Sequence, residues 1–401
     1  MDRSFNREME SVYIYTDEKE CQVLKLFVDS NSLNPEFMKI FYNLDDLTLK
    51  LLKDNIDVNI ILISENVINL KFHRFKIVKE YIILSKKFYH LIHKDKIINM
   101  EEIGYLDTMH KIFNFGELKL GRNGNTFSLF HNTLEFDLSV GFPLLTTKKM
   151  FFRGIVSETL FFLSGQTDAK ILSKQGVKIW DDNTSRETLD KLGFSKREEG
   201  DMGPLYGHQF YHFGAEYVDS HSNYKSQGFD QIEYVINLLL NDRNSRRMIM
   251  TSFNPGQAQQ GCLYPCHSIV IQFYVRDGKY LDTICYNRSQ DLFLGVPWNI
   301  SYIALFVKLM VCYINLKKKE KSLYEGKISL IMGDTHIYEN HKDSCLKQLL
   351  RLPYRFPKVE LLLNTEIKDI TFKDYIKLLS FDNLKLSDYN HHSKLGGSMI
   401  V

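Results

Sequence analysis

The fold class follows from one stretch, PCHSIVIQFYVRDGKYLDTICYNRSQDLFLGVPWN, which spans residues 265–299. Within it, His267–Val275 and Tyr280–Tyr286 are rich in β-branched and aromatic residues, and they flank Asp277-Gly278. Asp-Gly between two such runs is typical of a tight hairpin turn, so the stretch predicts two antiparallel strands. The apolar run from Trp298 to Leu316 follows at once and predicts a buried helix.

Two further helices are predicted earlier in the chain. Ile155–Leu163 is an apolar helical run interrupted only by Glu158, and Phe229–Asn241 has its apolar residues on one side. A polar turn and a short strand, Met248–Phe253, come next. Strands mixed with long helices predict an α/β or α+β fold.

The composition of the chain limits the number of its domains and the class of protein to which it belongs. With 401 residues, 44% hydrophobic and 25% charged, the chain is long enough for two or three domains or for one large domain with an extension. The net charge of +2 gives no global case for a nucleic-acid or membrane-surface protein. The longest apolar run, Ile300–Ile314, contains Lys308 and is shorter than the roughly 20 residues that span a bilayer, so it predicts a core helix.

The six cysteines and the N-terminal residues indicate the cellular compartment in which the protein is expected. The cysteine spacing is irregular and the count is low for this length, which favours a reducing compartment over a secreted disulfide framework. Residues 1–13 contain no apolar run of the kind found in signal peptides. We therefore expect a cytoplasmic protein.

Glycine is distributed unevenly along the chain. All 22 glycines lie from Gly104 onward, which predicts an N-terminal extension, residues 1–103, before a main domain, residues 104–401. Biased base composition acting on a weakly constrained segment would explain the same pattern. A glycine-free region cannot form a glycine-rich phosphate loop, so we expect a packing or interaction extension rather than a dinucleotide domain. Val58–Ile63 and Tyr81–Leu84 are predicted strands, and Leu47–Leu52 a predicted helix.

Cys266 is the first candidate for chemistry. Pro265 precedes it at the entrance of a predicted strand, and a cation nearby would lower its pKa from the usual ~8.5 toward the reactive thiolate. A buried structural cysteine is the alternative. His267 is not its expected base, because adjacent strand residues point to opposite faces. Cys262, Cys266 and His267 include zinc-ligand types, but no second ligand pair follows, so zinc is disfavoured.

Charged and aromatic residues outside this stretch are the next candidates. Arginines in three loops suit multidentate phosphate recognition, although each alone fits a solvated loop charge better: Arg122, Arg246, Arg247 and Arg288. Glu158 lies either on the solvent-exposed edge of its helix or in the protein interior. In the interior, burial would raise its pKa and suit it to proton transfer. The two tryptophans, Trp180 and Trp298, are core residues or stacking surfaces for a flat ligand.

Several segments in one order resemble the thymidylate synthase family over residues 103–401. They are Gly176–Asp181 (GVKIWD), Asp201–Gln209 (DMGPLYGHQ), Asn244–Asn254 (NSRRMIMTSFN), Pro265–His267 (PCH), Arg288–Asn299 (RSQDLFLGVPWN) and Gly333–His341 (GDTHIYENH). The insert Thr184–Gly200 and the run His212–Tyr217 resemble the eukaryotic branch. The resemblance implies a large twisted mixed β-sheet flanked by helices, with dimerisation through the sheet.

The resemblance also implies a reaction. Cys266 would attack carbon 6 of dUMP, and carbon 5 would then take a one-carbon unit from 5,10-methylenetetrahydrofolate. A base would remove the carbon 5 proton, and hydride from the same folate would complete the methyl group, giving dTMP and dihydrofolate. Because the folate is both carbon donor and reductant, neither NAD(P)H nor a metal is expected.

Residue roles carry over where the motifs match. The implied catalytic set is Cys266, Glu158, Tyr206, Arg288, Asp291 and Asn299. The implied dUMP-binding set is Arg122, Arg288 and Ser289 at the phosphate, Arg246 and Arg247 from the partner subunit of a homodimer, Asn299 at the uracil edge, His336 and Tyr338 at the ribose, with Asn287, Gln290 and Asp291. The implied folate-binding set is Lys148, Phe151, Trp180, Asn183, Asp291, Leu294, Gly295, Trp298 and the C-terminal Met399, Ile400 and Val401.

The sequence departs from the family pattern at a few positions. Asn287 replaces a glutamine and is one methylene shorter, which predicts that a hydrogen bond near the nucleophile lengthens or passes through water. Phe253 and Trp298 exchange one aromatic for another. The usual Pro-His-Pro near the C-terminus reads His391-His392-Ser393, which predicts looser closure of the tail.

Three other interpretations remain open. A deoxycytidylate hydroxymethylase shares the fold and the folate, but it should prefer Asp at position 299. A non-catalytic nucleotide- or RNA-binding relic of the fold is the second. The third concerns residues 1–103 alone, which faintly resemble the end of a dihydrofolate reductase domain, and a remnant of that kind is expected to be inactive.

Overall fold

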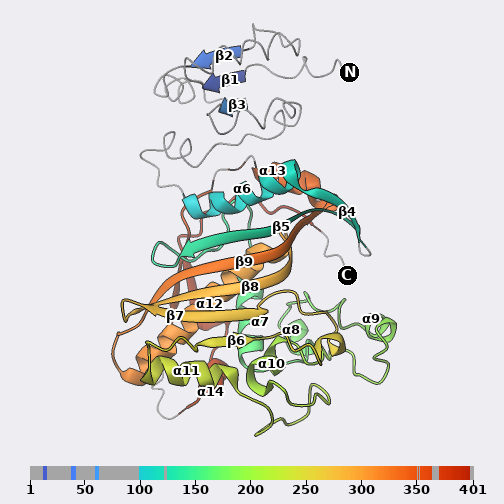
Figure 1. Cartoon of the computed structure of the whole chain (residues 1–401), viewed down its shortest axis with the longest axis vertical. Helices are drawn as coiled ribbons and strands as arrows, with labels where there is room; N and C mark the ends of the chain where they lie inside the picture. Colours follow the sequence, from blue (N-terminus) through green and yellow to red (C-terminus); the bar gives the residue numbers. More distant parts are fainter. Residues whose placement is uncertain are drawn as a thin grey trace. The chain divides into compact units, whose positions relative to one another are not determined.

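Figure 1 shows the computed structural model, which describes residues 99–121, 124–349, 351, 353–363 and 370–397 and the backbone of three short strands before them. The chain divides into two compact units. One comprises residues 1–110 and 345–354, and the other comprises residues 111–344 and 355–401.

The larger unit is built on a six-stranded sheet with the order β4-β5-β9-β8-β7-β6. Only β8 and β9 run parallel, so the sheet is mixed, as predicted. The strands are β4 (Glu117–Gly121), β5 (Gly124–Asp137), β6 (Ile249–Thr251), β7 (Val270–Arg276), β8 (Tyr280–Asp291) and β9 (Tyr324–Tyr338).

The β7–β8 hairpin confirms the predicted turn and corrects the predicted strand ends. Asp277 and Gly278 both have positive φ, +53° and +68°, which suits the right-handed twist of a two-residue hairpin. β7 begins at Val270 rather than His267, because Ser268 is left-handed (φ +52°) and breaks the extended backbone. β8 continues to Asp291, because its second half pairs in parallel with β9.

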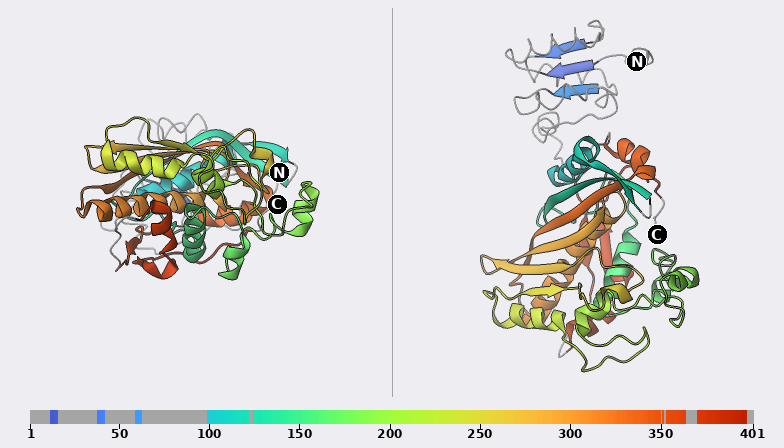
Figure 2. Two further views of the ribbon diagram at one scale, coloured as in Figure 1. Left: turned by 90° about the horizontal axis from the view of Figure 1, so that it is seen from below. Right: turned by 45° about the vertical axis from the view of Figure 1, so that its right-hand side comes forward.

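Helices cover one face of this sheet (Figures 1 and 2), and α12 (Gly295–Lys318) is the longest of those that the described residues form. It packs on β8, β9, α7 (Phe152–Leu163) and α11 (Gln231–Asn241). By length and composition α12 could cross a membrane, but 72% of its apolar window is buried, which fits the predicted core helix. The other helical segments are α8 (Lys170–Lys174), α9 (Arg186–Lys191), α10 (Tyr206–His212), η4 (Ala258–Gln260), η5 (Glu339–His341), α13 (Lys342–Leu349), α14 (Phe372–Lys377) and η6 (Phe381–Asn383), and β10 (Lys358–Leu361) pairs with β11 (Leu384–Ser387).

The opposite face of the sheet exposes apolar side chains. Residues of β6, β7 and β8 alternate between buried and exposed, as strands do. On the side that the described helices leave uncovered lie Ile249, Tyr274, Ile284 and Tyr286, with exposed fractions of 48%, 59%, 44% and 37%. Adjacent apolar side chains at this exposure mark a surface suited to association with another protein.

The smaller unit contains three short parallel strands in the order β2-β1-β3: β1 (Val12–Tyr15), β2 (Met38–Phe41) and β3 (Asn59–Leu62). β3 falls within the predicted strand Val58–Ile63, whereas the predicted helix Leu47–Leu52 and strand Tyr81–Leu84 lie outside the described residues. α6 (Met100–Phe115) begins just before the predicted boundary at residue 103.

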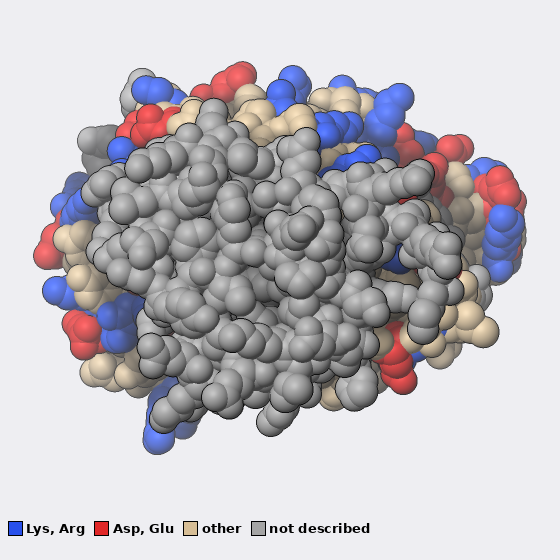
Figure 3. Space-filling model, turned by 90° about the horizontal axis from the view of Figure 1, so that it is seen from above, with Lys and Arg blue, Asp and Glu red and all other residues tan. Residues whose placement is uncertain are grey.

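Charges are mixed on the described surface that is visible in Figure 3, where Lys and Arg alternate with Asp and Glu around the rim. This mixture agrees with the small net charge and presents no single basic field on that visible part.

Candidate active site

The site is organised around the loop that carries Cys266. The backbone N–H groups of Arg288 and Ser289, at the end of β8, donate to Cys266 O at 2.9 and 3.3 Å. The Arg288 side chain returns to the same loop, with Nε donating to Pro265 O at 3.1 Å. The Tyr206 hydroxyl, from the first turn of α10, lies 3.8 Å from Cys266 Sγ. Three of the predicted catalytic residues therefore meet at this loop.

The surroundings of the Cys266 thiol act on its pKa in opposite directions. Burial raises the pKa, while the Tyr206 hydroxyl and the Arg288 guanidinium lower it, and burial has the larger effect. The predicted cation is present, but it does not by itself ionise the thiol. Cys266 is half-buried, whereas Cys262 and Cys285 are buried with their pKa raised to about 12. Cys266 is thus the most accessible of these three thiols.

His267 does not serve as a base for Cys266. Its ring stacks on Tyr206 with centroids 4.2 Å apart, and its Nδ1 lies 3.1 Å from Ser268 Oγ. Burial lowers its pKa to about 3, so the imidazole is neutral near pH 7. No group of three potential metal-ligating side chains occurs among the residues that the structure describes.

Asn287 holds the loop from its buried side. Its side chain is fully buried, and Oδ1 accepts from Ser268 N at 2.7 Å and from the Cys285 thiol at 3.4 Å. Ser268 is the left-handed residue two positions after Cys266, so this bond stabilises a strained backbone. The bond to Ser268 is short, and the lengthening of a hydrogen bond near Cys266 stays a prediction. Asn287 Nδ2 is buried without a partner.

Glu158 is buried, which resolves the two alternatives for its position. It lies on α7 with 5% of its surface exposed, and it accepts from Trp180 Nε1 at 2.8 Å and from Trp298 Nε1 at 2.5 Å. Burial raises its pKa to about 7, and the two indole hydrogen bonds offset part of that effect. A carboxyl that titrates near neutral pH can both accept and return a proton.

Trp298 also forms an aromatic wall with Phe151. The rings lie edge to face with centroids 6.5 Å apart, and 48% of Phe151 is exposed. A Cβ on Gly154 would lie 2.5 Å from Phe151 and 2.6 Å from Trp298, so only glycine allows this packing. Gly154 was absent from the predicted site, because nothing in a helical apolar run marks it.

The end of β8 brings polar side chains beside α12. Asn299 Nδ2 donates to Gln290 Oε1 at 2.8 Å, and Gln290 Nε2 donates to Ser289 O at 2.9 Å. Asp291 Oδ1 accepts from Phe293 N at 2.8 Å and Leu294 N at 3.2 Å, which fixes the turn that leads into α12 at Gly295.

The parallel pairing of β8 and β9 places the predicted ribose-binding residues nearby. Asp291 is opposite His336 in the register of the two strands. His336 Nδ1 lies 3.2 Å from Asp334 Oδ1, and this contact lowers the pKa of Asp334 to about 2. Tyr338 packs edge to face on His336, with ring centroids 5.2 Å apart.

The remaining predicted residues are less closely grouped. Lys148 is buried, donates to Phe293 O and lies 3.8 Å from the Phe293 ring centroid. Asn183 is half-buried. Arg246 and Arg247 are exposed in the turn between α11 and β6, and neither forms an ion pair within the described ranges. Outside the described residues lie Arg122, Met399, Ile400 and Val401.

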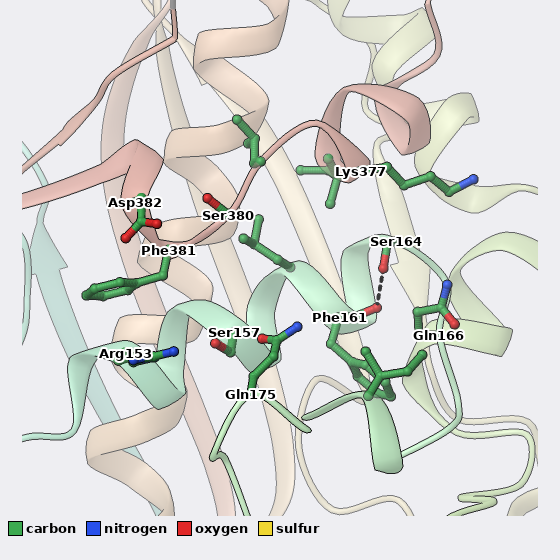
Figure 4. Close-up of a pocket in the computed structure, with 14 residues that line it drawn as sticks. Arg153, Ser157, Phe161, Ser164, Gln166, Gln175, Lys377, Ser380, Phe381 and Asp382 are labelled. Atoms are coloured by element: carbon green, nitrogen blue, oxygen red, sulfur yellow. Dashed lines mark hydrogen bonds between the residues drawn. The ribbon is translucent and has the colours of Figure 1, made fainter. Parts of the chain in front are cut away.

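Figure 4 shows a separate cavity of about 610 Å³ on another side of α7. Arg153, Ser157 and Phe161 of α7 line it together with Ser380 and Phe381. None of the predicted site residues lines this cavity. The candidate active site is therefore the Cys266 loop and not this hollow.

The fold and the site define an enzyme domain with a candidate cysteine nucleophile, Cys266, beside the end of β8 in a mixed sheet. The family model for thymidylate synthase matches residues 103–401, and the chain belongs to this family. It is 42% identical over 314 residues to the thymidylate synthase of Saccharomyces cerevisiae, with 76% of this chain and 98% of that protein covered. It is 41% identical over 303 residues to the thymidylate synthase of Human herpesvirus 8 type P, covering 75% and 85%.

Bifunctional relatives match the same part of the chain. The chain is 42% identical over 325 residues to the bifunctional dihydrofolate reductase-thymidylate synthase of Paramecium tetraurelia, covering 79% of this chain and 66% of that protein. A bifunctional relative of Arabidopsis thaliana is covered over 53% of its length. The chain thus spans about half to two thirds of these bifunctional relatives, and the relation of residues 1–103 to a reductase stays a prediction.

Proposed function

We propose that this protein catalyses the reductive methylation of dUMP to dTMP, with 5,10-methylenetetrahydrofolate as donor of both carbon and hydride. One observation carries the proposal: the half-buried Cys266 thiol lies 3.8 Å from the Tyr206 hydroxyl, on a loop that the backbone of Arg288 and Ser289 holds in place. Membership of the thymidylate synthase family supports it independently.

The nucleophile begins the reaction. Cys266 reacts as the thiolate after its proton has passed to water: Sγ forms a bond to carbon 6 of the pyrimidine, and the electron pair of the 5,6 double bond moves toward carbon 5 and oxygen 4. The Arg288 guanidinium and the Tyr206 hydroxyl favour the thiolate, which offsets part of the effect of burial. Together with Arg122, Arg288 and Ser289 also bind the nucleotide phosphate. The end of β8 therefore contributes both to nucleotide binding and to activation of the Cys266 thiol.

Glu158 handles the proton transfers. Its pKa of about 7 allows the carboxylate to accept a proton and the acid to return it at neutral pH. Trp180 and Trp298 hold both oxygens by hydrogen bonds, which fixes the carboxyl plane.

The residues present fit a folate. A flat heterocycle requires an exposed aromatic surface beside the nucleotide, and Phe151 with Trp298 offers one above Gly154. Asp291, Leu294 and Gly295 form the turn next to it. When bound, methylenetetrahydrofolate supplies the one-carbon unit and the hydride, so the proposal includes neither a metal nor NAD(P)H.

We further propose a cytoplasmic homodimer that associates through the uncovered sheet face. The exposed Ile249, Tyr274, Ile284 and Tyr286 lie on that face and support this arrangement. Arg246 and Arg247 are exposed beside edge strand β6, where they are free to reach the phosphate site of a second subunit.

A single experiment tests the chemistry. The protein is incubated with 5-fluoro-dUMP and methylenetetrahydrofolate, denatured and weighed by mass spectrometry. We expect the mass of both ligands on the chain, because fluorine cannot leave carbon 5 as a proton does. Cys266→Ser should form no adduct, and Cys312→Ser, a matched change of another half-buried thiol, should form it fully. A parent protein that binds the nucleotide but forms no adduct would support the non-catalytic relic instead.

The deoxycytidylate hydroxymethylase interpretation is tested by substrate preference. The presence of Asn rather than Asp at position 299 favours uracil. Turnover of dCMP in preference to dUMP by the parent protein would reverse this assignment.

A further inference from the structure

Two side-chain amides form a chain of hydrogen bonds from the backbone to the base-reading residue. Ser289 O accepts from Gln290 Nε2 at 2.9 Å, and Gln290 Oε1 accepts from Asn299 Nδ2 at 2.8 Å. Gln290 is 2% exposed and Asn299 9% exposed, so water competes little for either bond. No residue within the described ranges donates to Asn299 Oδ1.

This chain determines which way each amide is turned. A carbonyl oxygen can only accept, so the Gln290 atom facing Ser289 O must be the NH₂ group, and the atom facing Asn299 must be Oε1. Asn299 in turn must present its own NH₂ group to Gln290. The orientation of both amides is therefore set by one backbone carbonyl.

The orientation of Asn299 decides which base it can read. With Nδ2 held by Gln290, one N–H of that group and the Oδ1 acceptor remain for a ligand. Uracil presents oxygen 4 as acceptor beside N3–H as donor, which this arrangement matches. Cytosine presents an amino donor at carbon 4 beside an N3 acceptor, and it would need the opposite orientation of the amide.

We propose that Gln290 is a positioning residue that makes the site selective for uracil over cytosine by fixing the orientation of the Asn299 amide. This inference rests on the proposed function. To read cytosine, Asn299 would turn Oδ1 toward Gln290 Oε1 and set two acceptors against each other. Turning Gln290 as well would only move the same conflict to Ser289 O. Either conflict leaves buried polar atoms unpaired, which corresponds to roughly ten- to a hundredfold in affinity.

The test compares two nucleotides on matched variants. Gln290→Met keeps the length and volume of the side chain and removes both hydrogen bonds. Thr335→Val is the control, because Thr335 lies opposite Gln290 in the parallel register, is fully buried and has no partner for its hydroxyl. For each protein, the Kd values of dUMP and dCMP are measured by calorimetry, and kcat/KM is measured with dUMP.

We expect the preference for dUMP over dCMP to fall about tenfold or more in Gln290→Met, partly because dCMP binds more tightly. Thr335→Val should keep the preference of the parent protein. A folded Gln290→Met protein whose preference stays within twofold of the parent value would overturn the inference, even if its turnover falls. A parent protein that fails to bind dUMP would instead reject the proposed function, so the two failures are distinguishable.

Discussion

The ionisation of Glu158 should make the stability of the fold depend on pH. Its pKa is raised from 4.5 to about 7 by burial, so the folded state binds this proton more tightly than the unfolded chain does. The stabilisation is therefore fully present below pH 4.5 and is lost as the pH rises through about 7. Since one pKa unit corresponds to about 1.4 kcal/mol, the full loss is about 3 kcal/mol.

Glu158→Gln removes this titration and nearly preserves the shape of the side chain. The variant carries a constant penalty, because an amide can accept from only one of the indole N–H groups of Trp180 and Trp298. The penalty does not depend on pH. Between pH 5 and pH 8.5 the unfolding free energy of the parent protein should therefore fall by roughly 2 to 3 kcal/mol relative to that of the variant.

The measurement is urea unfolding of both proteins at several pH values and one protein concentration. Glu216→Gln is the control, because Glu216 is exposed and its curve should run parallel to that of the parent protein. If the Glu158→Gln curve also runs parallel to the parent curve within about 0.5 kcal/mol, burial does not raise the pKa of Glu158 as argued. Its assignment to proton transfer would then lose its physical basis.

Three further predictions concern the nucleophile, the dimer and the N-terminal boundary. Cys266→Ser should lose nearly all dTMP synthesis and keep dUMP binding, and turnover within about tenfold of the parent value would exclude Cys266 as the nucleophile. Inactive Arg247→Ala and Cys266→Ser subunits, once mixed and re-associated, should regain activity in hybrid dimers, and no recovery would refute the shared site. The full chain should not reduce dihydrofolate with NADPH, and a chain starting at Asn99 should still make dTMP. A chain starting at residue 104 should be less stable than the chain starting at Asn99 by more than about 1 kcal/mol, because it lacks both the cap in which Asn99 Oδ1 accepts from Glu102 N and the buried Glu102 and Ile103 of α6; equal stabilities would contradict this role of the first turn.

Local signals in the sequence predicted the elements that depend on local physics. Asp277-Gly278 marks a turn because both residues tolerate positive φ, and the hairpin forms there. The run after Trp298 is too apolar to be exposed, and α12 is the buried core helix. By contrast, His267 is outside its predicted strand, because the left-handed Ser268 is held by Asn287, 19 positions later in the chain. A contact between residues this far apart in the sequence produces no periodic pattern from which it could be predicted.

The environment of Glu158 shows the same limit in the site. A carboxylate on an apolar helix fits either a wet edge or a buried position, and only its partners decide between them. Those partners are Trp180 and Trp298, which are 22 and 140 positions away along the chain. Composition identified both tryptophans as candidates for a flat ligand, but their hydrogen bonds to Glu158 could not be inferred from spacing. The role of Gly154 could not be predicted either, because Trp298, which packs against it together with Phe151, is distant in the sequence.

The selectivity that we assign to Gln290 depends on a break in strand periodicity. Along β8, buried and exposed residues alternate from Leu281 to Arg288, and continuing that alternation would place residue 290 on the exposed side. Gln290 is nevertheless buried, because Asn299 of α12 packs against it after the turn that Asp291 fixes. At this end β8 has buried side chains on both of its faces, Asn287 toward the Cys266 loop and Gln290 toward the Asn299 amide. One strand end therefore supports the group that would form the covalent bond and orients the group that would choose the base, so a substitution that shifts this strand end should change turnover and base preference together.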